Sequence, residues 1–228
     1  MDANLVESGL RSVENEKFDQ IYPARIRELS GLHWTPVRVA LEAARLLVTS
    51  PGTRVLDVGC GPGKFCLVGA SLTQGVFTGV EQREELVIAA RNAAERMHLR
   101  GLNIIHGNLL DLTFRDYDAF YLYNPFEENM TRGNKIDVTV PLSPFLFKKY
   151  NSYVAAELGN MPIGTRVVTY AGYADEIPGC YDCELALFDN ELKLWIKRRE
   201  YEADIERLGL HTTRSYRGPI GWVTPRQP

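Results

Sequence analysis

One short stretch, Thr53 to Lys64, constrains the fold of this chain more than any other, and it reads T-R-V-L-D-V-G-C-G-P-G-K. Its apolar run at 55–58 has the length and composition of a buried β-strand. Glycine then recurs at every second position, which permits a tight turn where backbone approaches a ligand closely. The next residues, 65–70, read as the start of a helix. A strand, a glycine turn and a helix in this order predict a nucleotide-binding unit of the doubly wound α/β type.

Two carboxylates strengthen the prediction of a ligand at this turn. Asp57 lies inside the strand, and Glu81 follows a second apolar run at 76–80, 20 residues after Gly61. A carboxylate at that strand end can accept both hydroxyls of a ribose. The spacing G-x-G-x-G differs from the G-x-G-x-x-G of dinucleotide-binding folds. An NAD-dependent oxidoreductase stays open as an alternative, although it should contain a second mononucleotide-binding half.

The combination V-L-D-V-G-C-G-P-G followed by G-V-E resembles the class I S-adenosylmethionine (SAM)-dependent methyltransferases, over roughly residues 35–124. The resemblance implies a Rossmann-like α/β sheet, mostly parallel with a C-terminal antiparallel hairpin and with helices on both faces. It also implies SAM as the cofactor and methyl transfer as the activity. A catalytically inactive SAM-binding subunit or sensor is a further alternative, because few residues of this class are catalytic.

The remaining sequence pattern fits this layout. Further strands are predicted at 103–106, 118–123 and 165–171, and a hairpin with an Asp-Asn turn at 184–198. Helices are predicted from Pro36, capped by Thr35, and at 84–100, 144–159 and 201–208. The segment 172–183 is too short and too rich in turn residues for the helix that the family usually has there. We expect residues 1–50 to form an N-terminal helical extension and residues 51–228 to form the SAM-binding methyltransferase domain.

The resemblance also predicts the cofactor contacts, most of them at the ends of the predicted strands. Asp57 would reach the ammonium group of SAM, Glu81 the ribose, and Asn108 and Leu109 the adenine. Thr35 belongs to a T-P element that contacts the SAM carboxylate in many amino-directed methyltransferases, and a simple helix cap is the other interpretation. The full predicted set is Thr35, Asp57, Gly59, Cys60, Gly61, Gly63, Lys64, Glu81, Gln82, Asn108, Leu109 and Asn124.

The predicted acceptor site is Asn124-Pro125-Phe126, at the end of the strand at 118–123. It resembles the N-P-P-F/Y signature of amino-methylating enzymes, with one proline instead of two. Asn124 is therefore predicted to be catalytic, Pro125 and Phe126 to bind substrate, and the acceptor to be an amine on a protein or a small molecule. An oxygen acceptor would need a base or a metal, and no carboxylate cluster near this strand offers one.

Composition narrows the partners and the compartment. The net charge of −3 gives no global field that favours nucleic acid, so a nucleic-acid partner is not expected. The N-terminus lacks the pattern of a signal peptide, and no apolar run has the length of a membrane helix. The four cysteines lack a disulfide-framework spacing, which predicts a reducing, cytoplasmic location. Cys180 and Cys183 form C-x-x-C without two further ligands, so no metal is predicted.

Overall fold

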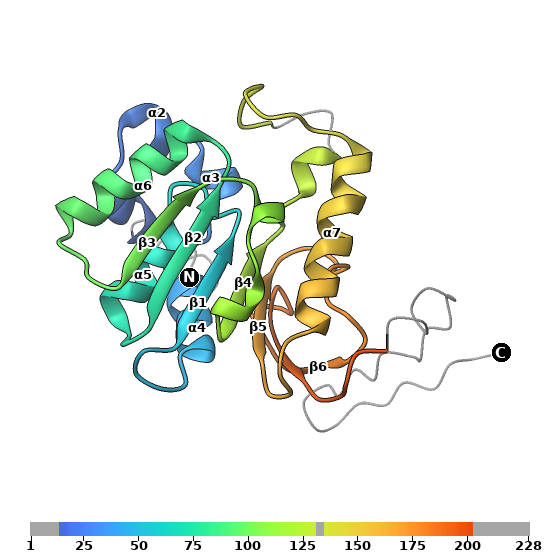
Figure 1. Cartoon of the computed structure of the whole chain (residues 1–228). Helices are drawn as coiled ribbons and strands as arrows, with labels where there is room; N and C mark the ends of the chain where they lie inside the picture. Colours follow the sequence, from blue (N-terminus) through green and yellow to red (C-terminus); the bar gives the residue numbers. More distant parts are fainter. Residues whose placement is uncertain (1–13, 131–134, 203–228) are drawn as a thin grey trace, which may run out of the picture.

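A single seven-stranded sheet organises the chain (Figure 1). The structure is a computed structural model and describes residues 14–130 and 135–202. The strands are β1 (Arg54–Val58), β2 (Val76–Glu81), β3 (Leu102–His106), β4 (Ala119–Tyr123), β5 (Arg166–Tyr170), β6 (Tyr181–Leu187) and β7 (Leu192–Lys197). Their spatial order is β3-β2-β1-β4-β5-β7-β6. The first five pair in parallel, whereas β7 runs antiparallel to both β5 and β6. The predicted Rossmann-like layout is therefore confirmed.

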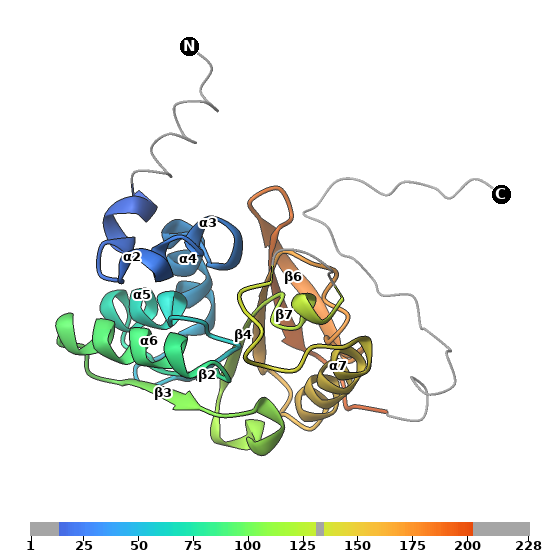
Figure 2. The ribbon, with the colours of Figure 1, turned by 90° about the horizontal axis from the view of Figure 1, so that it is seen from above.

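Side chains along β1 alternate between two hydrophobic layers, as the pleat of a strand requires. Val55 belongs to the layer formed with α4 (Val37–Leu47), α5 (Lys64–Leu72) and α6 (Glu84–Arg96). Leu56 belongs to the layer formed with α7 (Pro144–Gly159) and the turns around β4. Figure 2 shows α4, α5 and α6 gathered on one side and α7 on the other. Both faces of β1 are thus buried, which explains its continuous apolar sequence.

The helices stay close to the sheet because small residues face it. Gly69 in α5 packs against the ring of Phe77 on β2, and a Cβ at Gly69 would lie 2.4 Å from that ring. The start of α7 is set by Ser143, whose Oγ accepts a hydrogen bond from the backbone N–H of Leu146. Pro144 occupies the first turn, where its missing N–H is tolerated. These local signals agree with the predicted bounds of α7.

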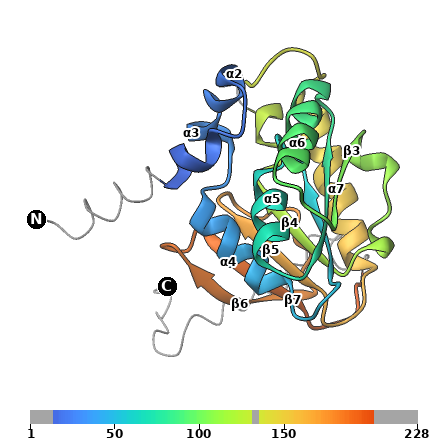
Figure 3. The same ribbon diagram turned by 90° about the vertical axis from the view of Figure 1, so that its left-hand side faces the viewer.

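The segment before α4 lies at the end of the sheet to which the parallel strands point. In Figures 1 and 3, the short helices α2 (Ala24–Arg27) and α3 (Ser30–His33) lie above α4 and α5. The segment touches the glycine turn directly, because the hydroxyl of Tyr22 donates to the carbonyl of Pro62 at 3.0 Å. Since α4 itself packs on the sheet, the domain boundary between residues 50 and 51 stays a prediction.

Two predicted helix ends are wrong. Helix α4 begins at Val37 and not at Pro36, and Thr35 is not its cap. The Val37 N–H instead donates to Oδ1 of Asn15 at 2.9 Å, so a residue distant in sequence satisfies this helix end. Helix α6 ends at Arg96 rather than near residue 100, because His98 adopts a left-handed φ of 52°. This conformation directs two N–H groups back to the last carbonyls of the helix, a Schellman-type ending.

The region before the hairpin agrees with the prediction that a helix is missing there. No helix lies between β5 and β6, a stretch that the structure describes throughout. Strand β6 begins at Tyr181, three residues earlier than predicted. The turn of the hairpin contains three consecutive residues with positive φ, at 188–190. The helix predicted at 201–208 falls almost wholly outside the described residues.

Candidate functional site

A cavity of about 280 Å³ lies at the carboxyl ends of the parallel strands. Backbone and side chains from the ends of β1, β2, β3 and β4 line it, together with the segment that leads to α7. Of the predicted site residues, it brings together Gly59, Gly61, Glu81, Gln82, Leu109, Asn124, Pro125 and Phe126. Open α/β sheets bind ligands at this edge, because loops from neighbouring strands diverge there.

The glycine turn bends sharply beneath this cavity. Gly59, Gly61 and Gly63 have left-handed φ values of 71°, 54° and 76°, which other residues adopt only with strain. A Cβ at Gly59 would lie 3.1 Å from Cβ of Pro125, so the turn and the predicted acceptor segment are in close contact. A Cβ at Gly61 would meet nothing within 4 Å, which leaves open space for a ligand above it. Gly63 lines neither this cavity nor the smaller one described below, and it faces Ala90 of α6 instead.

Glu81 at the end of β2 is buried and binds the glycine turn. Its Oε2 accepts the N–H of Gly61 at 3.1 Å and its Oε1 accepts the N–H of Arg83 at 2.9 Å. Burial raises the pKa of the Glu81 carboxyl, and these N–H groups oppose the rise. An ionised carboxylate has about four acceptor positions, so Glu81 retains capacity for a ligand.

A second, smaller cavity of about 40 Å³ adjoins the first, and the two share His33, Trp34, Gly59, Gly61 and Tyr123. Three further predicted site residues, Thr35, Asp57 and Cys60, line it. Asp57 is buried and accepts a weak hydrogen bond from the Cys66 thiol at 3.4 Å. Burial raises the pKa of Asp57 to about 7, and the negative charge of Glu81 adds to the rise. A cationic group in the small cavity would therefore find a carboxylate that lacks a cation.

Lys64 also lines the small cavity, but its ammonium group is already paired. Its Nζ lies 2.8 Å from Oδ1 of Asp19, and both side chains are buried. The same Nζ donates to Oδ1 of Asn15 at 3.1 Å. The main role that the structure gives Lys64 is thus to hold the N-terminal segment on the glycine turn. Its predicted contact with the cofactor stays a prediction.

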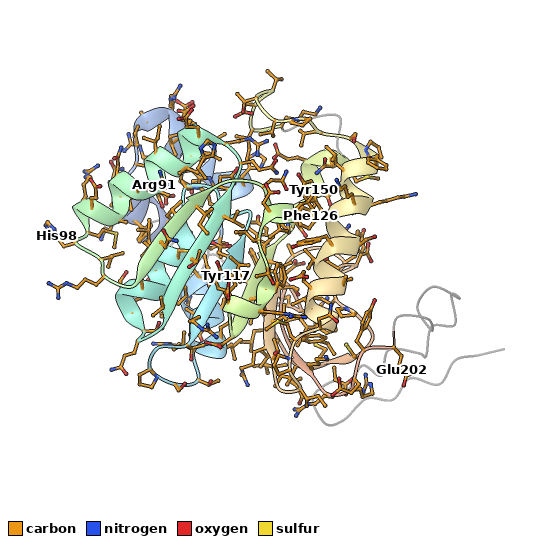
Figure 4. The ribbon with its side chains drawn as sticks, in the orientation of Figure 1. Arg91, His98, Tyr117, Phe126, Tyr150 and Glu202 are labelled. Atoms are coloured by element: carbon orange, nitrogen blue, oxygen red, sulfur yellow. The ribbon has the colours of Figure 1, made fainter. Side chains whose placement is uncertain are left out.

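Asn108 lies behind the large cavity rather than in its lining. Its Oδ1 accepts the N–H of Leu110 at 3.0 Å, and its Nδ2 donates to Tyr150 and to Gln82. It therefore orients two residues that do line the cavity. Figure 4 shows Tyr150 next to Phe126, and the two rings stack with centroids 5.0 Å apart.

Asn124 lines the large cavity in an unusual backbone conformation. Its φ is 39°, in the left-handed region, and its carbonyl accepts the N–H of Glu127 at 3.2 Å. Its side chain packs over Gly172, just after β5, where a Cβ would lie 1.8 Å from Asn124 Oδ1. Gly172 therefore leaves the space that the Asn124 amide occupies. The sequence offered no signal for this pairing, because the two residues follow different strands and lie almost fifty residues apart in sequence.

Sequence reasoning also missed Arg83, which is buried and lines the large cavity. Its guanidinium donates to Glu128 at 2.9 Å and to Asp137 at 3.1 Å, and lies 3.9 Å from Glu81. The guanidinium of Arg83 thus connects Glu81, the residue predicted to bind the ribose, to the segment that follows β4. The position of Arg83, two residues after the predicted G-V-E element, was the available signal, but the partner carboxylates lie more than forty residues away in sequence.

Comparison with known proteins identifies the domain. Residues 49–138 match the protein family described as "Methyltransferase domain". Residues 49–138 therefore carry a methyltransferase domain. The predicted family is thereby confirmed, and the match spans the glycine turn, Glu81 and Asn124. A demethylmenaquinone methyltransferase of Bacillus cereus is 31% identical over 83 residues, which are 36% of this chain. The match covers 35% of that relative, so this chain spans about a third of its length.

Solved structures show the same fold. An RNA methyltransferase from Salinibacter ruber, crystallised with S-adenosyl-L-homocysteine, has a TM-score of 0.54 and 18% identity over 75% of this chain and 97% of its own. TrmN from Thermus thermophilus has a TM-score of 0.54 and 19% identity over 75% of this chain and 51% of its own. At these identities the likeness concerns the fold. None of the described helices is long and apolar enough to span a membrane.

Proposed function

We propose that this methyltransferase binds SAM in the two adjoining cavities and transfers its methyl group to an amine on a protein or a small molecule. The observation that carries the proposal is the pair of buried carboxylates, Glu81 in the large cavity and Asp57 in the small one, separated by an open glycine turn. SAM has a ribose and an ammonium group to match these two acceptors. NAD has a ribose but no ammonium group at the corresponding end.

The residues present fit this cofactor in their chemistry and in the space around them. Glu81 would accept the ribose hydroxyls, and Asp57 would accept the ammonium group. Leu109 offers an apolar surface for the adenine. The open space above Gly61 admits the chain that links the nucleoside to the amino-acid end. When bound, SAM supplies an electrophilic methyl group, and the protein then has to align an acceptor with it.

Asn124 is the residue we assign to aligning the acceptor. A nitrogen acceptor keeps its protons until after transfer, and an amide oxygen can accept one of them. That contact would direct the nitrogen lone pair towards the methyl group. The position of Asn124 between the glycine turn and Gly172 supports this role, because it restrains the side chain at the edge of the cavity. Pro125 and Phe126 would pack on the acceptor.

Two further expectations belong to this proposal. We favour a protein or small-molecule acceptor over nucleic acid, because the net charge is −3. The RNA methyltransferase among the structural neighbours makes RNA a necessary arm of the test. The cytoplasmic location predicted from the four cysteines, all free and buried, also stays a prediction.

The cofactor is tested by calorimetric titration with S-adenosylhomocysteine and, separately, with NADH. We expect S-adenosylhomocysteine to bind, and Glu81→Ala to weaken it by ~1–3 kcal/mol, as for a lost charge-assisted hydrogen bond. Glu95→Ala removes an exposed carboxylate from α6 and should change nothing. Binding of NADH without binding of S-adenosylhomocysteine would contradict the proposal.

The acceptor is tested with radiolabelled SAM on separate pools of peptides, small amines, quinones and RNA. We expect label in an amine pool, and Asn124→Ala to lower kcat by ~10²-fold while the affinity for S-adenosylhomocysteine is kept. Asn103→Ala, an exposed asparagine on β3, is the matched control. Label found only in RNA or in a quinone would refute the amine, and cofactor binding without turnover would indicate a sensor.

A further inference from the structure

The indole of Trp34 carries a buried donor that none of the described residues accepts. Trp34 is 6% exposed, and its Nε1 has no hydrogen-bond partner in the part of the chain that the structure describes. Buried N–H groups in native proteins are nearly always paired, so an unpaired one calls for an explanation. Trp34 also lines both cavities, at their junction. We propose that the Trp34 indole N–H binds the carboxylate of the SAM amino-acid end. The inference rests on the proposed function.

Several other donors around the small cavity already have partners. The hydroxyls of Thr35 and Tyr121 bond to each other at 2.8 Å, and the ammonium group of Lys64 is paired with Asp19. The N–H of Gly61 donates to Glu81. Thr35 was the residue that the sequence predicted for the cofactor carboxylate. The contact predicted for Thr35 stays a prediction, and the neighbouring Trp34 offers a donor that needs no rearrangement of the Thr35–Tyr121 hydrogen bond.

The ring of Trp34 is held in place from several sides. It packs edge-on against Tyr22 with centroids 5.0 Å apart, and Nζ of Lys64 lies 5.9 Å from the ring centroid. Tyr22 in turn donates to Pro62 of the glycine turn. A donor on a restrained ring needs little ordering on binding, and this favours a directional contact with a ligand.

The charges of the small cavity suit an amino-acid end. Asp57 and Trp34 both line this cavity, so a carboxylate for the ammonium and an indole donor for the carboxylate on the same carbon come from residues around one small space. A cavity of about 40 Å³ admits a small polar group of this kind. A hydrogen bond from a neutral donor to a carboxylate is charge-assisted and therefore stronger than a neutral pair. The contact would thus distinguish ligands that carry the carboxylate from those that lack it.

The test compares two ligands, S-adenosylhomocysteine and its decarboxylated form, by calorimetry on Trp34→Phe and wild type. Wild type should bind S-adenosylhomocysteine about 10- to 100-fold more tightly than the decarboxylated ligand. Trp34→Phe should lose most of that ratio by weakening S-adenosylhomocysteine alone. Trp195→Phe is the control, because its buried indole N–H already donates to Thr169 Oγ1 at 2.9 Å. Its ligand ratio should match wild type.

A second variant separates the N–H from the ring. Benzothienylalanine at position 34 keeps the shape of the indole and replaces its N–H by sulfur, so it serves if Trp34→Phe does not fold. Equal weakening of both ligands, or an unchanged ratio in both variants, would overturn the assignment of Trp34 and leave the proposed function standing. Failure of wild type to bind either ligand would overturn both.

Discussion

Buried polar side chains lie at both ends of the sheet, and the two ends differ in how these side chains are paired. At the carboxyl ends of the parallel strands, Trp34 Nε1 has no partner among the described residues, and Asp57 receives only a long bond from a thiol. Around the hairpin, Trp195 Nε1 donates to a hydroxyl at 2.9 Å. Lys197, whose backbone N–H bonds to Thr165 just before β5, donates through its side chain to the carbonyls of Gly159 and Met161, each at 2.6 Å.

The difference shows which end is built for stability and which for a ligand. Lys197 places a cation at the C-terminal end of α7, where unpaired carbonyls favour positive charge. Asp57 is buried with no cation beside it among the described residues, and this costs stability unless a ligand supplies one. Polar groups that a fold leaves unpaired are expected at functional sites. Three pairs of measurements test this difference.

The largest effect is expected at Lys197. Lys197→Met should lower the free energy of unfolding by about 2–4 kcal/mol, because two buried carbonyls lose their donor and an unsatisfied buried group costs ~1–3 kcal/mol. Urea denaturation measures the loss. The affinity for S-adenosylhomocysteine, measured in parallel, should stay within about twofold because the site is distant. A stable Lys197→Met variant, or one with impaired binding, would contradict the division between the two ends.

Lys197→Met should lose stability and keep its affinity for the ligand, whereas Asp57→Asn should gain stability and lose affinity. The folded pKa of Asp57, about 7, exceeds the ordinary value of 3.8, so folding takes up a proton between these values. The stability of the ligand-free protein should therefore fall as the pH rises from 4 to 7 and level off above 7. Asp57→Asn removes this slope, so it should be more stable than wild type at pH 8 by about 1–3 kcal/mol.

Binding supplies the second half of the Asp57 test. An ionised Asp57 attracts the ligand ammonium, so wild type should bind S-adenosylhomocysteine more tightly as the pH rises through 7. Asp57→Asn should bind more weakly at pH 8, with no such pH dependence. Denaturation and calorimetry at pH 5, 6, 7 and 8 measure both quantities. Parallel stability curves for wild type and Asp57→Asn would show that Asp57 is ionised throughout and would count against the unpaired carboxylate.

The smallest effect is expected at the two glycines that flank β5. Gly172 and Gly164 have φ values of 74° and 94°, so alanine at either should cost about 1 kcal/mol of stability. Gly164 has nothing within 4 Å of an added Cβ, whereas Gly172 faces the amide of Asn124. Gly172→Ala should therefore also lower kcat, by roughly tenfold. Equal turnover in the two variants would mean that the position of Asn124 does not matter for catalysis.

Much of the fold could be predicted from the sequence, because its signals are local. A run of apolar residues, glycines at alternate positions and a capped amphipathic stretch each act within a few residues, so β1, β2 and α7 were found near their observed bounds. The predictions were wrong where a residue distant in sequence makes a hydrogen bond that was expected from a neighbouring residue. Asn15 accepts the hydrogen bond from the first N–H of α4, whereas Thr35, the predicted cap, is bonded to Tyr121.

The strands of the sheet, the glycine turn and the position of Glu81 follow from the amino-acid sequence alone. The pattern of apolar residues in a strand and the spacing of glycines in a turn are both local to a few consecutive residues. Only the tertiary structure decided the pairing of the polar groups. It placed Asp19 beside Lys64, Gly172 against Asn124, and Trp34 at the junction of the two cavities, where its N–H has no partner within 14–130 and 135–202. Whether a buried polar group is satisfied depends on which distant segments meet around it, and no local pattern records that.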